Sequence, residues 1–264
     1  MIVLETFLKS PRQWPIILLN SSQLMIINQR FITIKKSEES MDQEKEKVLL
    51  FWSGGKDSAL ALHYLKQDPK YEIIGLVTTF DREKNTVRFH GIPDSLIIDQ
   101  AKLLKLPLQR IFLASECSNE EYTEHVGKIL ALFAKRGIRT IAFGDIHQEE
   151  IRNFREKMLA PLEMKAIFPL WGKNSMDVSR EFLNTGHKAL VTSIMTAKLD
   201  NSFLAVEFDH AWLDRLPENI DAAGEGGEFH TFVTYGPNFK TRVAFSKAIA
   251  SSDGPYLVSS VKEP

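Results

Sequence analysis

The stretch that decides the fold is LLFWSGGKDSALALHYL, from Leu49 to Leu65, in which an apolar run stops at Ser53–Ser58 and then resumes. A strand that ends in two glycines, a lysine and an aspartate before a helix is typical of a phosphate-binding turn. A Walker loop needs a glycine five residues before its Gly-Lys pair and a Ser or Thr after the lysine. Leu50 and Asp57 occupy those two positions, so the turn is not of the Walker kind.

Length and composition are those of an ordinary globular protein, with 264 residues, 44% of them hydrophobic and 25% charged. Such a chain suits one large domain, or one domain with a smaller partner. A formal net charge of -1 argues against bulk attraction to nucleic acid or to an anionic membrane. The single cysteine, Cys117, excludes an internal disulfide and a Cys-x-x-Cys site, so a reducing, cytoplasmic location is expected.

The N-terminal segment differs from the rest of the chain. Its apolar pieces are too short to span a bilayer, and it lacks the pattern of a secretory signal. We interpret residues 1–46 as a poorly specified extension, and we expect Met41 to be the true start of the protein. A weak targeting segment is the competing interpretation, because acidic residues are scarce before Glu38.

From Val48 onward, strand-like and helical patterns alternate and predict an α/β fold. This alternation is typical of right-handed βαβ units, so we expect a Rossmann-like parallel sheet with helices on both faces. The predicted strands are Val48–Trp52, Ile73–Thr78, Leu108–Leu113 and Ile138–Phe143. The helices predicted between and after them are Ser58–Lys66, Ser95–Lys105, Glu120–Lys135 and Glu149–Leu159.

The second half predicts a smaller α/β domain, with a helix at Ser175–Asn184 and strands at Ala189–Met195 and Phe229–Tyr235. We therefore divide the chain into a first domain at 47–166, which contains the turn at Ser53–Ser58, and a C-terminal domain at 167–264. A cleft between two domains is a natural place for a ligand.

The turn at Ser53–Ser58 has the groups that a polyphosphate needs. Its glycines allow close approach of the backbone, and the N–H groups at the start of the next helix favour an anion. Lys56 supplies a positive charge, whereas the carboxylate of Asp57 would repel phosphate unless Mg²⁺ lies between them. The competing interpretation is a capped helix with both side chains solvated. The residues expected to bind the nucleotide are Ser53, Gly54, Gly55, Lys56, Asp57 and Ser58.

A second glycine-rich stretch, Gly224–Thr231, also carries chemical groups. Its glycines allow tight folding that would bring Glu225, Glu228 and His230 near each other, and the last two would share one face of a strand. Such a cluster could bind ammonium, orient an acceptor or move a proton. A surface hairpin with solvated acids is the alternative.

Three further places are weaker candidates. Gly144 and Asp145 end the fourth predicted strand and would face the same crevice as the phosphate turn. His90 follows the second strand, where adenine or ribose would lie, although a plain loop histidine fits as well. Arg152 and Arg155 lie three apart on one helical face and could meet a carboxylate or a phosphate, although a solvated face is the interpretation that we favour.

Several motifs together resemble one family of enzymes. The hexapeptide at Ser53–Ser58 resembles the SGG-x-[DS]-S loop of the PP-loop ATP pyrophosphatases, which are also called N-type. Four other motifs, in order, resemble those of the diphthine–ammonia ligase family within this superfamily. They are Arg88–Pro93, Gly144–Ile146, Phe168–Gly172 and Gly224–Phe232. Members of the family tend to carry alanine where this chain has Asp145, and that departure bears on the acceptor.

The resemblance implies a ligase that cleaves ATP between its α and β phosphates with Mg²⁺. It would adenylate a carboxylate on an acceptor, such as the modified protein side chain diphthine, and ammonia would then displace AMP. The catalytic residues implied are Lys56, Asp57, Asp145, Glu228 and His230, with Asp57 as the metal ligand and His90 beside the nucleotide. The acceptor side would comprise Gly144, Asp145, Glu225, Glu228 and His230.

Three other functions remain open on the sequence. A PP-loop enzyme that thiolates tRNA usually needs a cysteine to carry sulfur, often a pair, and this nearly neutral chain has only Cys117. An adenine-nucleotide hydrolase of the same fold would use the same phosphate turn. A non-catalytic nucleotide-binding module would leave Asp57 and the C-terminal glutamates without a task.

Overall fold

The computed structural model describes residues 44–88 and 90–264. The interpretation of residues 1–46 as an extension, and of Met41 as the start, falls almost entirely outside these residues. Of the predicted extension only its last three residues are described, and the first strand, β1, begins within them at Glu46.

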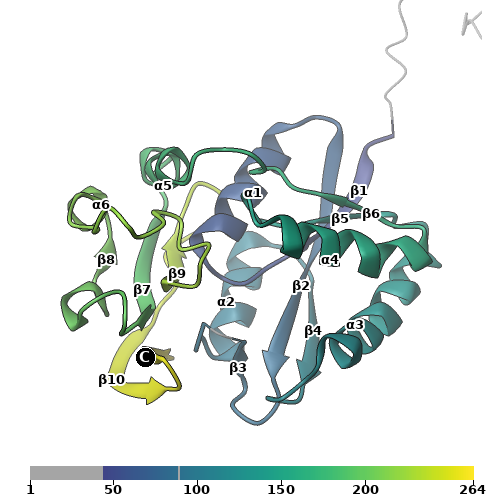
Figure 1. Cartoon of the computed structure of the whole chain (residues 1–264). Coiled ribbons are helices and arrows are strands. Elements are labelled where there is room, and N and C mark those ends of the chain that lie inside the picture. Colours follow the sequence, from purple (N-terminus) through teal and green to yellow (C-terminus); the bar gives the residue numbers. More distant parts are fainter. Residues whose placement is uncertain (1–43, 89) are drawn as a thin grey trace, which may run out of the picture. The chain divides into compact units, whose positions relative to one another are not determined.

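A parallel sheet forms the first half, as predicted (Figure 1). Its strands run in the order β2-β1-β5-β6, β4 pairs in parallel with β2, and β3 pairs antiparallel with the end of β2. The strands are β1 (Glu46–Phe51), β2 (Tyr71–Asp81), β3 (Thr86–Val87), β4 (Leu108–Leu113), β5 (Thr140–Ala142) and β6 (Lys165–Ile167). The order reverses beside β1, which therefore ends at the point where open α/β sheets bind ligands.

Helices cover both faces of this sheet. Successive residues of a strand point to opposite faces, so Leu50 packs with α1 and α2 whereas Leu49 packs with α3 and α4. The third helix begins with a capping box, in which Ser118 and Glu121 satisfy each other's backbone N–H groups. The helices are α1 (Lys56–Gln67), α2 (Asp94–Leu104), α3 (Asn119–Ala134) and α4 (Glu149–Leu159), followed by a short 3-10 helix, η1 (Ala160–Leu162). The predicted Rossmann-like α/β fold is confirmed.

The second half is built around an antiparallel sheet in which β7 pairs with β8, β9 and β11, and β10 pairs with β11. Its strands are β7 (Lys188–Met195), β8 (Glu207–Phe208), β9 (Phe229–Tyr235), β10 (Ser246–Asp253) and β11 (Tyr256–Lys262). Its helices are α5 (Ser175–Asn184), η2 (Asn201–Phe203) and α6 (His210–Asp214). This is the smaller C-terminal α/β part that the sequence predicts.

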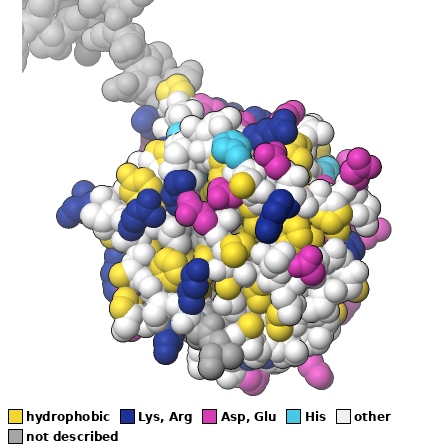
Figure 2. Space-filling view, turned by 90° about the vertical axis from the view of Figure 1, so that its left-hand side faces the viewer, with side chains coloured by type: hydrophobic (Ala, Val, Ile, Leu, Met, Phe, Trp, Pro, Cys, Tyr) yellow, Lys and Arg dark blue, Asp and Glu magenta, His cyan; other side chains and the backbone are white. Residues whose placement is uncertain are grey.

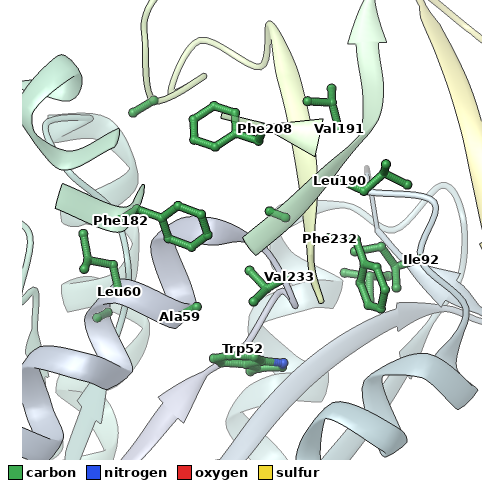
Figure 3. Packing of buried hydrophobic residues seen from close by; sticks show 14 of the residues in the cluster. Trp52, Ala59, Leu60, Ile92, Phe182, Leu190, Val191, Phe208, Phe232 and Val233 are labelled. Carbon is green, nitrogen blue, oxygen red and sulfur yellow. The ribbon is translucent and has the colours of Figure 1, made fainter. Parts of the chain in front are cut away.

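One hydrophobic core joins the two sheets. Trp52 and Leu60 from the first half belong to the same buried cluster as Phe182, Phe232 and Val233 from the second, as Figure 3 shows. Helix α1 lies between the sheets, in contact with β1 and β2 on one side and with β9 and α5 on the other (Figure 1). Residues Glu44–Pro264 form one compact unit, so the division near residue 166 stays a prediction.

The surface in Figure 2 carries basic and acidic side chains with apolar side chains between them. In the part of the chain that the structure describes, we find no helix with the length and apolarity that crossing a membrane requires.

Candidate nucleotide-binding site

The turn at Ser53–Ser58 connects the end of β1 to the start of α1. Gly54 has φ +82°, a left-handed conformation that glycine adopts without strain. The N–H of Gly55 donates to Ser53 Oγ over 3.2 Å, and Ser58 Oγ donates to Gly55 O over 2.9 Å. Gly55 is the N-cap of α1 and has no side chain to accept from the first N–H groups of the helix, which favours an anion there.

Strand β9 and helix α2 hold this turn from the opposite side. The N–H of Val233 donates to Gly54 O over 2.8 Å, and the N–H of Lys56 donates to Thr231 Oγ1 over 3.0 Å. Gln100 is fully buried, and its amide donates to Gly54 O and Val233 O and accepts from Trp52 Nε1 at 2.8 Å. The geometry of the turn therefore depends on segments far away in the sequence.

Replacing Gln100 with leucine is expected to lower the free energy of unfolding by about 2–4 kcal/mol, because Trp52 Nε1 and Val233 O would remain buried without their partner. Denaturant unfolding measures the change. The matched control is Gln67→Leu on the exposed surface, expected to change stability by about 0.5 kcal/mol or less. Equal losses for the two variants would contradict the role given to Gln100.

A cavity of about 710 Å³ opens beside the turn, within the size range of small-molecule sites. It brings together residues from both halves of the chain, which supports a site between the two sheets. The predicted site residues that line it are Ser53, Gly55, Lys56, Asp57, Ser58, His90, Gly144, Asp145, Glu225 and His230. Gly54 lies behind this surface, with Ile97 and Gln100 against it, and Glu228 does not line the cavity.

Lys56 and Asp57 are paired with each other in this structure. The buried ammonium of Lys56 donates to both carboxylate oxygens of Asp57, over 2.8 and 2.9 Å, and to Ala223 O. It also lies 5.3 Å from the centre of the Phe229 ring. A cation bound to Asp57 would replace Lys56 as the partner of this carboxylate, and the positive charge of Lys56 could then act on a phosphate.

Asp57 fits the predicted Mg²⁺ as a single protein ligand. Mg²⁺ keeps several waters and usually takes one or two carboxylates together with phosphate oxygens. The Asp57 side chain is 27% exposed and faces the cavity beside the phosphate turn. Among residues 44–88 and 90–264, no three or more His, Cys, Asp or Glu side chains come together as a metal site. A Mg²⁺ at Asp57 would therefore depend on the phosphate oxygens of a bound nucleotide for further ligands.

Gly144 allows the end of β5 to approach the phosphate turn closely. A Cβ at this position would lie 3.0 Å from the carbonyl carbon of Asp57 and 3.1 Å from the Ser58 nitrogen. A side chain here would push the backbone of the turn away by a few tenths of an ångström, so glycine favours this close approach. The next residue, Asp145, is thereby placed at the cavity wall.

Asp145 faces Arg155, whose Nε lies 3.6 Å from Asp145 Oδ2. Both atoms are buried and lack hydrogen-bond partners among the described residues. Burial raises the pKa of the Asp145 carboxyl, and the charge of Arg155 opposes that rise. Arg155 also stacks on Phe143, with its guanidinium carbon 4.7 Å from the ring centre, and donates to the Tyr122 hydroxyl. The expectation that Arg155 is solvated is wrong, since aromatic neighbours bury it on the cavity wall.

Glu225 is held at the same place from several directions. Its Oε2 accepts from the Ile146 N–H over 3.0 Å, and its carbonyl accepts from Gln148 Nε2 over 2.6 Å. Its own N–H donates to Asp221 Oδ1 over 3.3 Å. Burial, and after it the charge of Asp57, raises the pKa of the Glu225 carboxyl to about 7, although the Ile146 N–H opposes that rise.

Glu228 and His230, expected beside Glu225, have different partners. Glu228 is buried and accepts from Lys198 Nζ over 2.9 Å. His230 lies next to His90 on the cavity wall, with 4.3 Å between the ring centres. Loss of hydration lowers the pKa of both imidazoles, and for His230 the neighbouring His90 lowers it further. Glu225 and His230 therefore line one cavity, whereas Glu228, bonded to Lys198, does not line it.

The fold and the phosphate turn define a class of protein, the α/β PP-loop proteins. Within this class the motifs can be compared with known families. Residues 46–166 match the model of the diphthamide synthase N-terminal domain, and residues 174–254 match that of the diphthamide synthase C-terminal domain. The chain belongs to the diphthamide synthase family.

Two curated relatives carry the name diphthine–ammonia ligase. The mouse protein is 24% identical over 141 residues, which cover 52% of this chain and 53% of the relative. The human protein is 24% identical over 134 residues, covering 49% of this chain and 50% of the relative. The chain thus spans about half the length of these relatives. A crystal structure from Methanocaldococcus jannaschii, described as a predicted subunit of tRNA methyltransferase, aligns with TM-score 0.41 and 17% identity. That alignment covers 73% of this chain and 98% of the other.

Proposed function

We propose that this chain is an ATP-dependent ligase that converts a carboxylate into an amide with ammonia. The observation that carries the proposal is the cavity in which the phosphate turn, Asp57 and the carboxyl groups of Asp145 and Glu225 meet. Family membership and two relatives named diphthine–ammonia ligase support the same chemistry. The acceptor would be a carboxylate-bearing molecule, with a modified protein side chain as the first candidate.

The residues of the turn have complementary tasks toward ATP. The backbone N–H groups at the start of α1 would hold the β and γ phosphates, which leave as pyrophosphate. Lys56 would neutralise the charge that develops on the leaving pyrophosphate. Asp57 would hold a Mg²⁺, which would neutralise negative charge on the phosphates. His90, on the wall of the same cavity, is proposed to lie beside the ribose or the base.

The proposed reaction has two steps. In the first, an oxygen of the acceptor carboxylate attacks the α-phosphorus and a new P–O bond forms. The bond from the α-phosphorus to the oxygen that bridges it to the β-phosphorus breaks, and pyrophosphate leaves with the electrons of that bond. In the second, ammonia attacks the acyl carbon, a C–N bond forms, the nitrogen loses a proton to water, and AMP leaves with the electrons of the C–O bond. The chain's contribution is to position the groups and exclude water.

The products of ATP cleavage test this proposal. With ATP, Mg²⁺ and a panel of carboxylates that includes a diphthine-containing peptide, we expect AMP and pyrophosphate, measured by chromatography. Hydroxylamine, which attacks an acyl adenylate without help, should trap the activated acceptor as a hydroxamate. Accumulation of ADP and phosphate as the main products would exclude cleavage between the α and β phosphates.

A further inference from the structure

The acidic residues around the cavity differ in how their carboxylates are used. Asp57 is bonded to Lys56 through both of its oxygens, and Asp145 faces Arg155. Glu225 accepts one hydrogen bond, from Ile146 to Oε2, and within residues 44–88 and 90–264 no group donates to its Oε1. Asp145 Oδ2 also lacks a hydrogen-bond donor, but it lies 3.6 Å from Arg155 Nε, whereas no cationic side chain among these residues forms an ion pair with Glu225. Glu225 therefore has an oxygen left for a ligand.

Hydrogen bonds to three neighbouring residues set the orientation of Glu225. Both of its backbone polar groups are used, the N–H by Asp221 and the carbonyl by Gln148, so the residue cannot turn away without breaking these contacts. Its contact with Ile146 ties it to the segment after β5, and Gly144 in that segment lies against the backbone of Asp57 and Ser58. Glu225 is thus held where the end of β5 meets the start of α1, at the phosphate turn.

The charges that act on Glu225 come from two elements besides its own loop. Lys56 and Asp57 at the start of α1 and Asp145 after β5 are its charged neighbours. Among the described residues Asp57 is paired with Lys56 and Asp145 faces Arg155, so Glu225 is the carboxylate of this group that has no paired cation and can hold a small cation itself. Ammonium is such a cation, and at neutral pH it is the main form of ammonia in water. It must lose a proton before its nitrogen can attack a carbon atom.

We propose that Glu225 is the group that accepts this proton, a role that rests on the proposed ligase function. Ammonium gives one proton to Glu225 Oε1, and the resulting ammonia attacks the acyl carbon of the adenylate. The attacking nitrogen loses a second proton to water as the C–N bond forms and the C–O bond to AMP breaks. The products are the amide, AMP and two protons, one of which returns from Glu225 to solvent.

The test compares two nucleophiles on Glu225→Gln, which keeps the shape of the side chain but accepts no proton. With ammonium chloride at neutral pH, we expect amide formation to fall about a hundredfold, the lower end for loss of a general base. With hydroxylamine, which is largely unprotonated at that pH, the rate should stay within about threefold of the wild-type rate. Raising the pH should restore the ammonium reaction of the variant, because free ammonia is then present in solution.

The matched control is Glu149→Gln, which removes an equal charge from an exposed residue at the start of α4 that does not line the cavity. It should change neither rate by more than about threefold. An equal loss with both nucleophiles would make Glu225 a structural residue and overturn the assignment. An ammonium-specific loss in Asp145→Asn or His230→Gln, but not in Glu225→Gln, would overturn it too. A wild-type protein inactive with both nucleophiles would instead refute the proposed ligase function.

Discussion

ATP is expected to bind Lys56→Ala about a hundredfold more weakly than the wild-type protein, and AMP formation should slow by at least the same factor. The variant loses a charge aimed at the pyrophosphate, and it also frees the Asp57 carboxylate that Lys56 now holds. An unpaired carboxylate beside phosphate adds repulsion to the lost attraction. Calorimetry measures the affinity, and chromatography of the nucleotides measures the rate.

The control for this prediction is Lys70→Ala, because Lys70 is an exposed lysine near the start of β2 and does not line the cavity. It should bind ATP normally. A folded Lys56→Ala variant, with a normal melting temperature, that bound ATP as tightly as the wild-type protein would show that the turn does not hold the phosphates.

The second large effect is expected for Gly54→Ala. A Cβ at this position would lie 2.5 Å from Ile97 Cδ1 and 2.9 Å from Gln100 Oε1, and the φ of +82° adds strain for any L residue. We expect the free energy of unfolding to fall by about 2–4 kcal/mol, since overpacking and a left-handed backbone act together. The turn would also shift, so ATP binding should be lost in the fraction that folds. Urea unfolding and calorimetry measure the two effects.

Gly137 provides a matched control for the backbone strain. Its φ is +81°, almost that of Gly54, but a Cβ there would meet nothing within 4 Å. Gly137→Ala should therefore lower stability by about 1 kcal/mol and leave ATP binding unchanged. If both glycine variants lost the same stability, crowding by Ile97 and Gln100 would have no part in the effect.

The sequence predicts the parallel sheet well because its strands are continuous apolar runs and its helices carry one apolar face. Three predicted elements begin and end at the same residues as in the structure. They are the strand Leu108–Leu113 and the helices Glu149–Leu159 and Ser175–Asn184. Strand β6 is missed since Lys165–Ile167 is too short to show a period, and its pairing with β5 stabilises it. The β10–β11 hairpin is missed because its strands are rich in serine, and pairing with β7 holds them in place.

The candidate site was easier to predict where one short motif contains it. The phosphate turn is such a motif, and five of its six residues line the cavity. Gln100 and Thr231, which hold the turn, were not predicted because their roles depend on contacts between distant segments. A signal existed for Gln100, a lone amide among the apolar residues of α2. Arg155 was misjudged because helical spacing does not show what packs against a face.

The hydrogen bonds between β9 and the phosphate turn limit how such a protein can be divided or recombined. A fragment that stops near residue 166 keeps every residue of the turn but loses Thr231 and Val233, which hold its backbone. Exchanging the C-terminal half for an unrelated one would therefore disturb the turn and also remove Glu225 and His230 from the cavity wall. The two halves are thus constrained to be inherited together, and a change in what the cavity binds would have to arise by point changes around an intact β9.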